Sequence, residues 1–225
     1  MKQNKTTIVI GSGVSGLACA CLLAKRGYKV KVLEANNFIG GCCSTTEMDG
    51  YVFNNGAMAV IMPELLDFVF ERLGVDRESV LRLRKITAPQ RTYFEDGVSV
   101  TLHNNAQIKI EGKKVDEGQI QRDMRALLSR WEPISQALLK LPTQPPSLSN
   151  LLAKTWRHLP RLTGTVGSEL NMLIKDEHLR STLMGYLSYA GGDTRKLPAP
   201  VLIAIIVLLK QGYFIPLAVM RPAQL

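Results

Sequence analysis

A glycine-rich turn between an expected strand and an expected helix constrains this chain more than any other feature. Thr6–Ile10 is short, apolar and β-branched, as expected for a buried parallel strand. A GxGxxG pattern follows at once, and Leu17–Arg26 then supplies good helix formers. Gly11 permits the tight turn, Gly13 lets a pyrophosphate approach the backbone, and Gly16 lets the helix pack closely on the strand. The N–H groups of the helix's first turn complete a phosphate site.

A second strand and an acidic residue give this turn its expected context. Lys29–Leu33 alternates lysine with apolar residues, and Glu34 closes it. An acid there accepts hydrogen bonds from both ribose hydroxyls of an adenosine and repels a 2′-phosphate, which disfavours NADP. The alternative for Glu34 is a solvated side chain at a strand end. GxGxxG alone is a weak signal, but strand, helix, second strand and acid together predict a dinucleotide-binding unit.

A second glycine pair, Gly40-Gly41, is followed by Cys42-Cys43-Ser44-Thr45 and by the segment Asp49-Gly50-Tyr51-Val52-Phe53. With these motifs the chain resembles the FAD-dependent amine-oxidase-like flavoproteins, and among them the phytoene desaturase, carotenoid isomerase and retinol saturase group. The resemblance implies FAD as the cofactor. The cofactor-binding residues that we predict are Gly11, Ser12, Gly13, Val14, Ser15, Gly16, Glu34, Ala35, Gly40, Gly41, Cys42, Thr45 and Gly56. Many family members have arginine where Cys42 stands, so one phosphate-facing charge is missing here.

The resemblance extends more thinly over Thr92–Val100, Tyr186–Pro200 and Gly212–Pro216. It implies an α/β fold: a Rossmann-like FAD/NAD(P)-binding three-layer domain with an inserted α+β substrate domain. We expect residues 1–90 to belong to the FAD-binding domain, 91–211 to the substrate domain, and 212–225 to return toward the FAD-binding domain. The relatives are about twice as long as this chain, beyond the usual size of one domain. We therefore expect the chain to correspond to their N-terminal half.

Local patterns predict further elements. Asp96-Gly97 is a signal for a two-residue type I′ hairpin turn. Pro63–Leu73 has apolar residues at helical spacing, and Asp176–Ala190 reads as a helix. Residues 118–141 predict a long helix with an apolar core stripe, which Pro133 should kink or split.

Charge and cysteine content limit the kinds of partner and the cellular location that we expect. The net charge is +9, without a dense basic block, so nucleic acid is a poor partner. An anionic membrane surface is a better one, and a merely basic soluble protein is an equal alternative. Residues 151–162 could form a basic helix, solvated or lying on a membrane. Val201–Leu209 is apolar but too short to span a bilayer. The four cysteines lack metal spacing, and we expect Cys19 and Cys21 to be packing residues. Free thiols favour a cytoplasmic location, with peripheral membrane association as an option.

Three functions from different classes follow. The first is an FAD-dependent oxidoreductase that desaturates, saturates or isomerises a long apolar polyene such as a carotenoid or retinoid. The second is an amine oxidase-like flavoenzyme, and the third is an inactive truncated FAD-binding fragment. No side chain maps securely to a catalytic acid or base. The histidines His103, His158 and His178 are scattered in the sequence without a metal or triad pattern, so we expect them to be surface or core residues.

Overall fold

The computed structural model describes residues 5–56, 59–139 and 162–217 and divides the chain into two compact units. Unit 1 comprises residues 1–85 and 214–225, and unit 2 comprises Ile86–Tyr213. The boundaries that we expected from the sequence are 90/91 and 211/212. The expectation of a basic helix over residues 151–162 lies, apart from Leu162, outside the described residues, as does His158.

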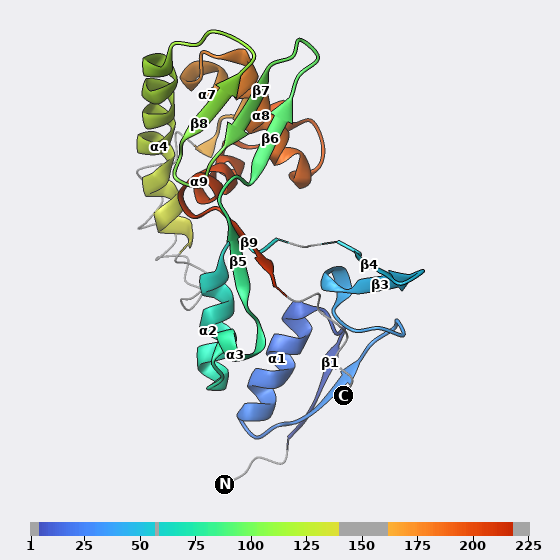
Figure 1. The fold of residues 1–225 in the computed structure, drawn as a ribbon. Helices are drawn as coiled ribbons and strands as arrows, with labels where there is room; N and C mark the ends of the chain where they lie inside the picture. Colours follow the sequence, from blue (N-terminus) through green and yellow to red (C-terminus); the bar gives the residue numbers. More distant parts are fainter. Residues whose placement is uncertain (1–4, 57–58, 140–161, 218–225) are drawn as a thin grey trace. The chain divides into compact units, whose positions relative to one another are not determined.

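Unit 1 begins with a parallel pair of strands joined by a helix (Figure 1). β1 (Thr6–Ile10) pairs with β2 (Lys29–Leu33) in the register Thr6↔Lys29 to Ile10↔Leu33, and α1 (Val14–Lys25) connects them. Both strands occupy the residues that the sequence predicts. This β–α–β order is the Rossmann-like fold expected from the glycine-rich turn.

The rest of unit 1 consists of short elements. After the 3₁₀ turn η1 (Gly41–Cys43), the strands β3 (Thr45–Met48) and β4 (Tyr51–Asn54) form an antiparallel hairpin. The helix α2 (Pro63–Leu73) begins with proline in its first turn and ends at Gly74, whose φ of +72° gives a left-handed C-cap. A short α3 (Arg77–Val80) follows, and β5 (Leu83–Ile86) pairs with β9 (Tyr213–Pro216).

β1 is not a buried strand among the described residues, so that expectation is wrong. The side chains of Ile8 and Ile10 are 57% and 86% exposed, and Cys19 and Cys21 on α1 are also exposed rather than packed. The physical reason is that the described part of unit 1 supplies a parallel sheet of two strands only, and a parallel sheet needs cover on both faces. Ala20 is the one buried apolar residue of unit 1 in the described ranges.

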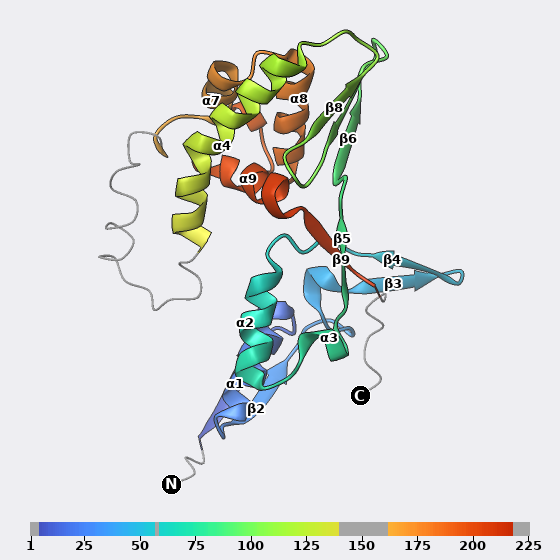
Figure 2. The same cartoon turned by 60° about the vertical axis from the view of Figure 1, so that its left-hand side comes forward.

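Unit 2 is an α+β body. The strands β6 (Gln90–Tyr93), β7 (Ser99–Leu102) and β8 (Ile108–Glu111) form an antiparallel sheet in that order. α4 (Glu117–Leu139) follows, and Pro133 lies inside it without splitting it. Next come α7 (Val166–Leu173), α8 (Glu177–Tyr186), the 3₁₀ turns η4 (Leu187–Ala190), η5 (Thr194–Lys196) and η6 (Ala199–Val201), and α9 (Leu202–Gln211). α8 packs against β6 and β7 (Figure 2).

The hydrophobic core lies in unit 2. Trp131, Leu127 and Ile134 of α4 are fully buried together with Leu170 of α7 and Ile205 of α9. The stripe on α4 is therefore core, as expected from its helical spacing. Val201–Leu209, the continuous apolar run of the sequence, supplies most of α9. Leu202 and residues 205–209 of this run are buried, because that side of the helix lies in this cluster.

The hairpin between β6 and β7 does not have a type I′ turn. The Phe94 N–H donates to the Val98 carbonyl oxygen at 2.8 Å, and the Gly97 N–H donates to the Phe94 carbonyl oxygen at 3.1 Å. Three residues therefore form the loop. Gly97 has a φ of +82°, whereas the φ of Asp96 is not positive. A type I′ turn requires positive φ at both central residues, so this loop is the three-residue kind closed by a left-handed glycine.

Candidate functional site

The glycine-rich turn lies where β1 ends and α1 begins. The Gly11 N–H donates to the Leu33 carbonyl oxygen at 2.7 Å, which extends the β1–β2 pairing by one residue. The Leu17 N–H donates to the Gly13 carbonyl oxygen at 2.9 Å and closes the first turn of α1. Val14 and Ser15 are exposed on that turn. Their N–H groups belong to the end of a helix where the backbone has no acceptor within the helix, which is a ready site for an anion.

Gly16 and Gly13 differ in what surrounds them. A Cβ at Gly16 would lie 2.1 Å from the Gly11 carbonyl oxygen, so α1 and the turn approach each other too closely for any side chain. A Cβ at Gly13 would meet nothing within 4 Å, and its backbone (φ −66°, ψ 170°) suits any residue. The structure therefore requires glycine at Gly16 for packing, whereas Gly13 leaves open space beside the turn.

The carboxylate of Glu34 binds back to this turn. It accepts from the Ser12 N–H at 2.7 Å and the Ser12 hydroxyl at 2.6 Å, and its other oxygen accepts from the N–H and side-chain amide of Asn36 at 3.0 Å each. The Ser12 hydroxyl, followed by the backbone N–H groups, lowers the Glu34 pKa from 4.5 to about 2. Glu34 is therefore ionised at neutral pH and keeps acceptor capacity at the tip of β2.

This contact predicts an acid-resistant turn. Because the pKa of Glu34 is lower in the folded chain than in the unfolded chain, the contact is complete above about pH 4.5 and is lost as the pH falls through about 2. Carboxyl ¹³C NMR of Glu34 should follow that midpoint together with the Ser12 amide shift. Ser12→Ala should move the midpoint back toward the ordinary value. A wild-type midpoint near 4.5 would contradict the contact.

The second glycine pair lies against the first. Gly13 and Gly40 form a parallel β-bridge, and the Gly40 N–H donates to the Ser12 carbonyl oxygen at 2.9 Å. Gly40 and Gly41 have φ values of +102° and +57°, and a Cβ at Gly41 would lie 3.2 Å from the Gly13 Cα. A side chain at Gly41 would therefore occupy the space beside the turn. The structure thus brings together segments that the sequence separates.

The remaining predicted residues lie around this pair. Ala35 and Cys42 are exposed, and Thr45 begins β3. A Cβ at Gly56 would lie 2.7 Å from the Cys42 carbonyl oxygen, so Gly56 packs on the η1 turn. Sequence reasoning missed Ser44, which is 7% exposed and accepts from the Asn55 side-chain amide at 2.9 Å. That cofactor atoms contact these thirteen residues stays a prediction.

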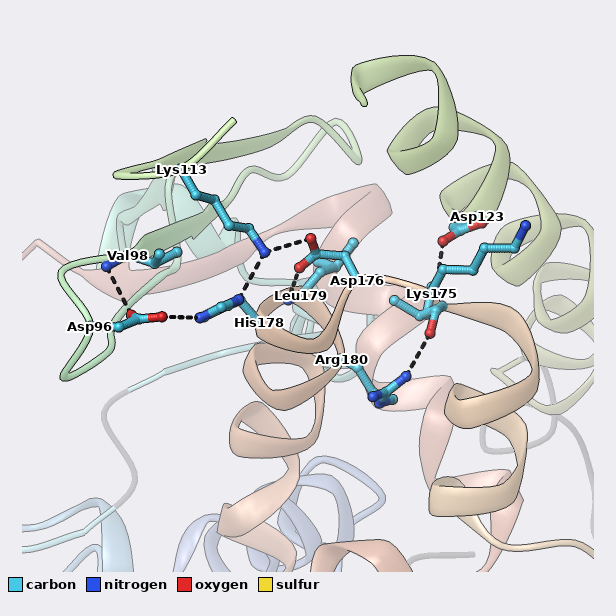
Figure 3. Close-up of polar contacts among 10 residues, drawn as sticks. Asp96, Val98, Lys113, Asp123, Lys175, Asp176, His178, Leu179 and Arg180 are labelled. Atoms are coloured by element: carbon cyan, nitrogen blue, oxygen red, sulfur yellow. Dashed lines mark hydrogen bonds and ion pairs between the residues drawn. The ribbon is translucent and has the colours of Figure 1, made fainter. Parts of the chain in front are cut away.

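Unit 2 contains a polar cluster that the sequence did not reveal (Figure 3). His178 Nε2 lies 2.8 Å from an Asp96 carboxylate oxygen, and His178 Nδ1 lies 2.8 Å from Lys113 Nζ. Lys113 also pairs with Asp176 at 2.6 Å. Since an ammonium can only donate, Nδ1 accepts and Nε2 carries the proton given to Asp96. His178 therefore has specific partners, although Asp96 and His178 are far apart in the sequence. The cluster ties the β6–β7 turn and the segment after β8 to the start of α8.

Asp176 is the central acid of this cluster. Burial raises its pKa, but the hydrogen bonds from Lys113 and from the Leu179 N–H outweigh burial and hold the pKa below its usual value. We expect Asp176→Ala to lower the free energy of unfolding by about 1–2 kcal/mol, because the N-cap of α8 is lost. Asp176→Asn, which keeps a cap acceptor, should cost less. Urea unfolding measures both, and the difference from wild type should shrink below about pH 4, where the ionised form loses its advantage. An undiminished difference at pH 3 would contradict this assignment.

Two kinds of site are not found in the part of the chain that the structure describes. No group of three or more histidine, cysteine, aspartate or glutamate side chains there could hold a metal ion. In the same residues, no helix is both long enough and apolar enough to cross a membrane. Cys19, Cys21, Cys42 and Cys43 are free thiols.

Comparisons with known proteins agree with this geometry. Residues 9–71 match the family model described as NAD(P)-binding Rossmann-like domain. A phytoene desaturase of Cercospora nicotianae is 39% identical over 119 residues, which is 50% of this chain and 19% of the relative. A zeta-carotene-forming phytoene desaturase of Myxococcus xanthus is 26% identical over 212 residues, which is 88% of this chain and 39% of the relative. The chain is similar in sequence to phytoene desaturases over these aligned residues. It spans well under half the length of these relatives.

Solved structures show the same fold. A putrescine oxidase redesigned in its cofactor binding matches with a TM-score of 0.60 at 18% identity, over 95% of this chain and 46% of that one. An oxidoreductase from Methanosarcina mazei matches with a TM-score of 0.58 at 17% identity, over 94% and 45%. The Rossmann-like fold and the resemblance to phytoene desaturases, both expected from the sequence, are thereby confirmed.

Proposed function

We propose that unit 1 binds FAD and that the chain is part of an FAD-dependent oxidoreductase acting on a long apolar polyene. The observation that carries the proposal is the convergence of two glycine segments and an ionised acid at one turn, in a chain similar in sequence to phytoene desaturases. The open space at Gly13 and the exposed first turn of α1 fit a diphosphate. Glu34 fits the ribose of an adenosine. FAD and the thirteen contact residues belong to this proposal.

The residues of the turn would have separate roles. The N–H groups of Val14 and Ser15 would bind the phosphates, and Gly41 would leave room beside Gly13 for them. Glu34, already held by Ser12, would accept from the ribose hydroxyls without a change of its own position. FAD supplies the hydride chemistry when it is bound. Cys42 contributes no positive charge to the phosphates, so binding would depend on backbone N–H groups and on the helix end.

The substrate belongs to the proposal as well. The two relatives reported above are phytoene desaturases, which supports an apolar polyene for this chain and unit 2 as its substrate domain. An amine substrate has weaker support, because the putrescine oxidase likeness at 18% identity concerns the fold alone. A membrane surface as the source of the polyene fits the net charge of +9.

A binding titration tests the proposal. The purified chain should take up FAD in a one-to-one ratio, with quenching of flavin fluorescence, and should discriminate against NADP because Glu34 opposes a 2′-phosphate. Anaerobic addition of a carotenoid set, but not of a set of primary amines and polyamines, should then bleach the flavin absorbance. A chain that takes up no FAD would favour the inactive fragment. Bleaching by amines alone would favour an amine oxidase.

A further inference from the structure

β8 forms an open edge of the unit 2 sheet. Within the described ranges, it lies at the end of the order β6-β7-β8 and pairs with β7 alone. The Phe94 N–H donates to the Val98 carbonyl oxygen, so Phe94 and Val98 are a hydrogen-bonded pair. With the register of β6 and β7, it follows that the backbone N–H and C=O groups of Val100 and Leu102 point toward β6. Hydrogen-bonded and non-hydrogen-bonded pairs alternate in an antiparallel ladder. The N–H and C=O groups of Ile108 and Ile110 therefore point away from β7, out of the open edge of the sheet.

A pocket of about 800 Å³ lies beside this edge. Its walls are β8, the connection that precedes β8, and the first half of α4. The apolar side chains of the pocket are Ala106, Ile108, Ile110, Val115, Ile120, Met124 and Leu128, and the polar ones are His103, Gln107, Lys109, Glu117, Gln121 and Arg125. Ile120 and Met124 are buried members of the core, so the pocket reaches the hydrophobic interior of unit 2. The volume lies in the range of binding pockets of roughly 300–1,000 Å³.

The open edge decides what kind of molecule fits. A polyene or a lipid chain would exclude water from the N–H and C=O groups of Ile108 and Ile110 without replacing their hydrogen bonds. Each group so stranded loses its hydrogen bond to water without a replacement, which weakens binding. An extended peptide satisfies the same groups through its own backbone and still fills the pocket with alternate side chains. A peptide strand thus uses both the backbone groups of the edge and the apolar pocket, whereas an apolar chain uses the pocket alone.

Charge narrows the choice of strand. Lys109 and Arg91 both pair with Glu111 on the outer face of the sheet, at 2.8 Å each, which leaves one positive charge in excess there. In the pocket, Arg125 is exposed on α4, and Glu117 is the single acid among the lining residues. The surroundings of β8 are therefore positive overall and favour acidic side chains on the incoming strand.

We propose that the β8 edge binds an extended segment of a partner polypeptide by strand addition. The segment would carry apolar residues at alternate positions, which enter the pocket, and acidic residues between or beside them, which face Lys109 and Arg125. The site lies in unit 2 and includes no residue of the glycine-rich turn, and the proposal does not depend on the proposed function.

A pair of isomeric peptides tests the backbone contact. The probe is a fluorescent seven-residue peptide, Glu-Ile-Glu-Val-Thr-Ile-Glu, titrated into the full chain with NMR detection of the Ile108 and Ile110 amides. We expect one-to-one binding and slowed exchange of both amides. Methylation of the peptide's alternate backbone nitrogens that face β8 should weaken binding at least about tenfold, since two or more hydrogen bonds are lost. Methylation of the other alternate set, with identical composition, should leave binding unchanged. No binding, or equal binding of the two methylated isomers, would overturn the proposal.

A charge variant and two competing occupants complete the test. Arg125→Glu changes an exposed side chain, so circular dichroism should stay at the wild-type signal, while affinity for the acidic peptide should fall at least about fivefold. A Lys-for-Glu version of the peptide should show the opposite preference. Protection of the Ile108 and Ile110 amides by self-association without peptide, seen by sedimentation, would assign the edge to a second copy instead. Protection by phosphatidylglycerol vesicles would assign it to a lipid. Either result would overturn the proposal.

Discussion

Gly13→Ala should weaken FAD binding by about 100-fold while the chain folds as well as the wild type. A methyl group at Gly13 meets no atom within 4 Å, and its backbone lies in a region open to alanine. The unfolded chain loses freedom through the substitution, so the free energy of unfolding should stay unchanged or rise by about 0.4–1 kcal/mol. The same methyl occupies the space in which we place the pyrophosphate. Two lost charge-assisted hydrogen bonds of about 1.5 kcal/mol each would weaken FAD by about 100-fold.

Gly16→Ala provides the contrasting variant. Its methyl would lie 2.1 Å from the Gly11 carbonyl oxygen, a backbone atom that cannot move without displacing the whole turn. We therefore expect Gly16→Ala to lower both the thermal stability of unit 1 and its affinity for FAD. The comparison separates a cofactor contact from a folding requirement within one motif. Fluorescence titration with FAD and thermal unfolding by circular dichroism measure the two effects. Full FAD binding by Gly13→Ala would contradict the placement of the pyrophosphate.

Local features of this fold could be predicted from the sequence. The strands Thr6–Ile10 and Lys29–Leu33 and the helix Pro63–Leu73 have the expected bounds. Each is fixed by residues within the element or next to it, such as the proline that starts α2 and the left-handed Gly74 that ends it. The meeting of the two glycine segments was also accessible, through a family resemblance rather than through spacing. Sequence patterns thus located the turn but gave none of its distances.

Properties that depend on distant parts of the chain could not be predicted. The exposure of Ile10 depends on what covers the sheet. The sequence of an apolar strand is the same whether or not its faces are covered. The contact of His178 with Asp96 depends on the packing of α8 on the β6–β7 hairpin, which no local pattern encodes. The Asp96-Gly97 signal predicted a turn correctly but its type wrongly, because loop length depends on where the strands begin to pair.

Glu169→Ala should destabilise unit 2 more than any surface substitution. The Glu169 side chain is 9% exposed, and its carboxylate accepts two hydrogen bonds from the Arg130 guanidinium, at 2.7 and 2.9 Å, and one from the Trp131 indole N–H at 3.0 Å. The hydrogen bond to Glu169 also raises the pKa of the Arg130 guanidinium, so this cation stays charged at all ordinary pH values. Glu169→Ala removes these hydrogen bonds from the fully buried Trp131 indole and from the largely buried Arg130 guanidinium. We expect the free energy of unfolding to fall by about 3 kcal/mol, the low end of the range for breaking a buried pair.

Glu111→Ala is the matched control for that prediction. Glu111 also pairs with an arginine at 2.8 Å, but the side chains of Arg91 and Glu111 are 46% and 41% exposed. Water screens such a pair, so its loss should lower the free energy of unfolding far less than the loss of Glu169 does. Glu169→Gln should fall between the two, because an amide oxygen can still accept from Trp131 or Arg130 but carries no charge. Urea unfolding followed by circular dichroism ranks the three variants. Equal losses for Glu169→Ala and Glu111→Ala would show that burial does not set the strength of the Arg130–Glu169 pair.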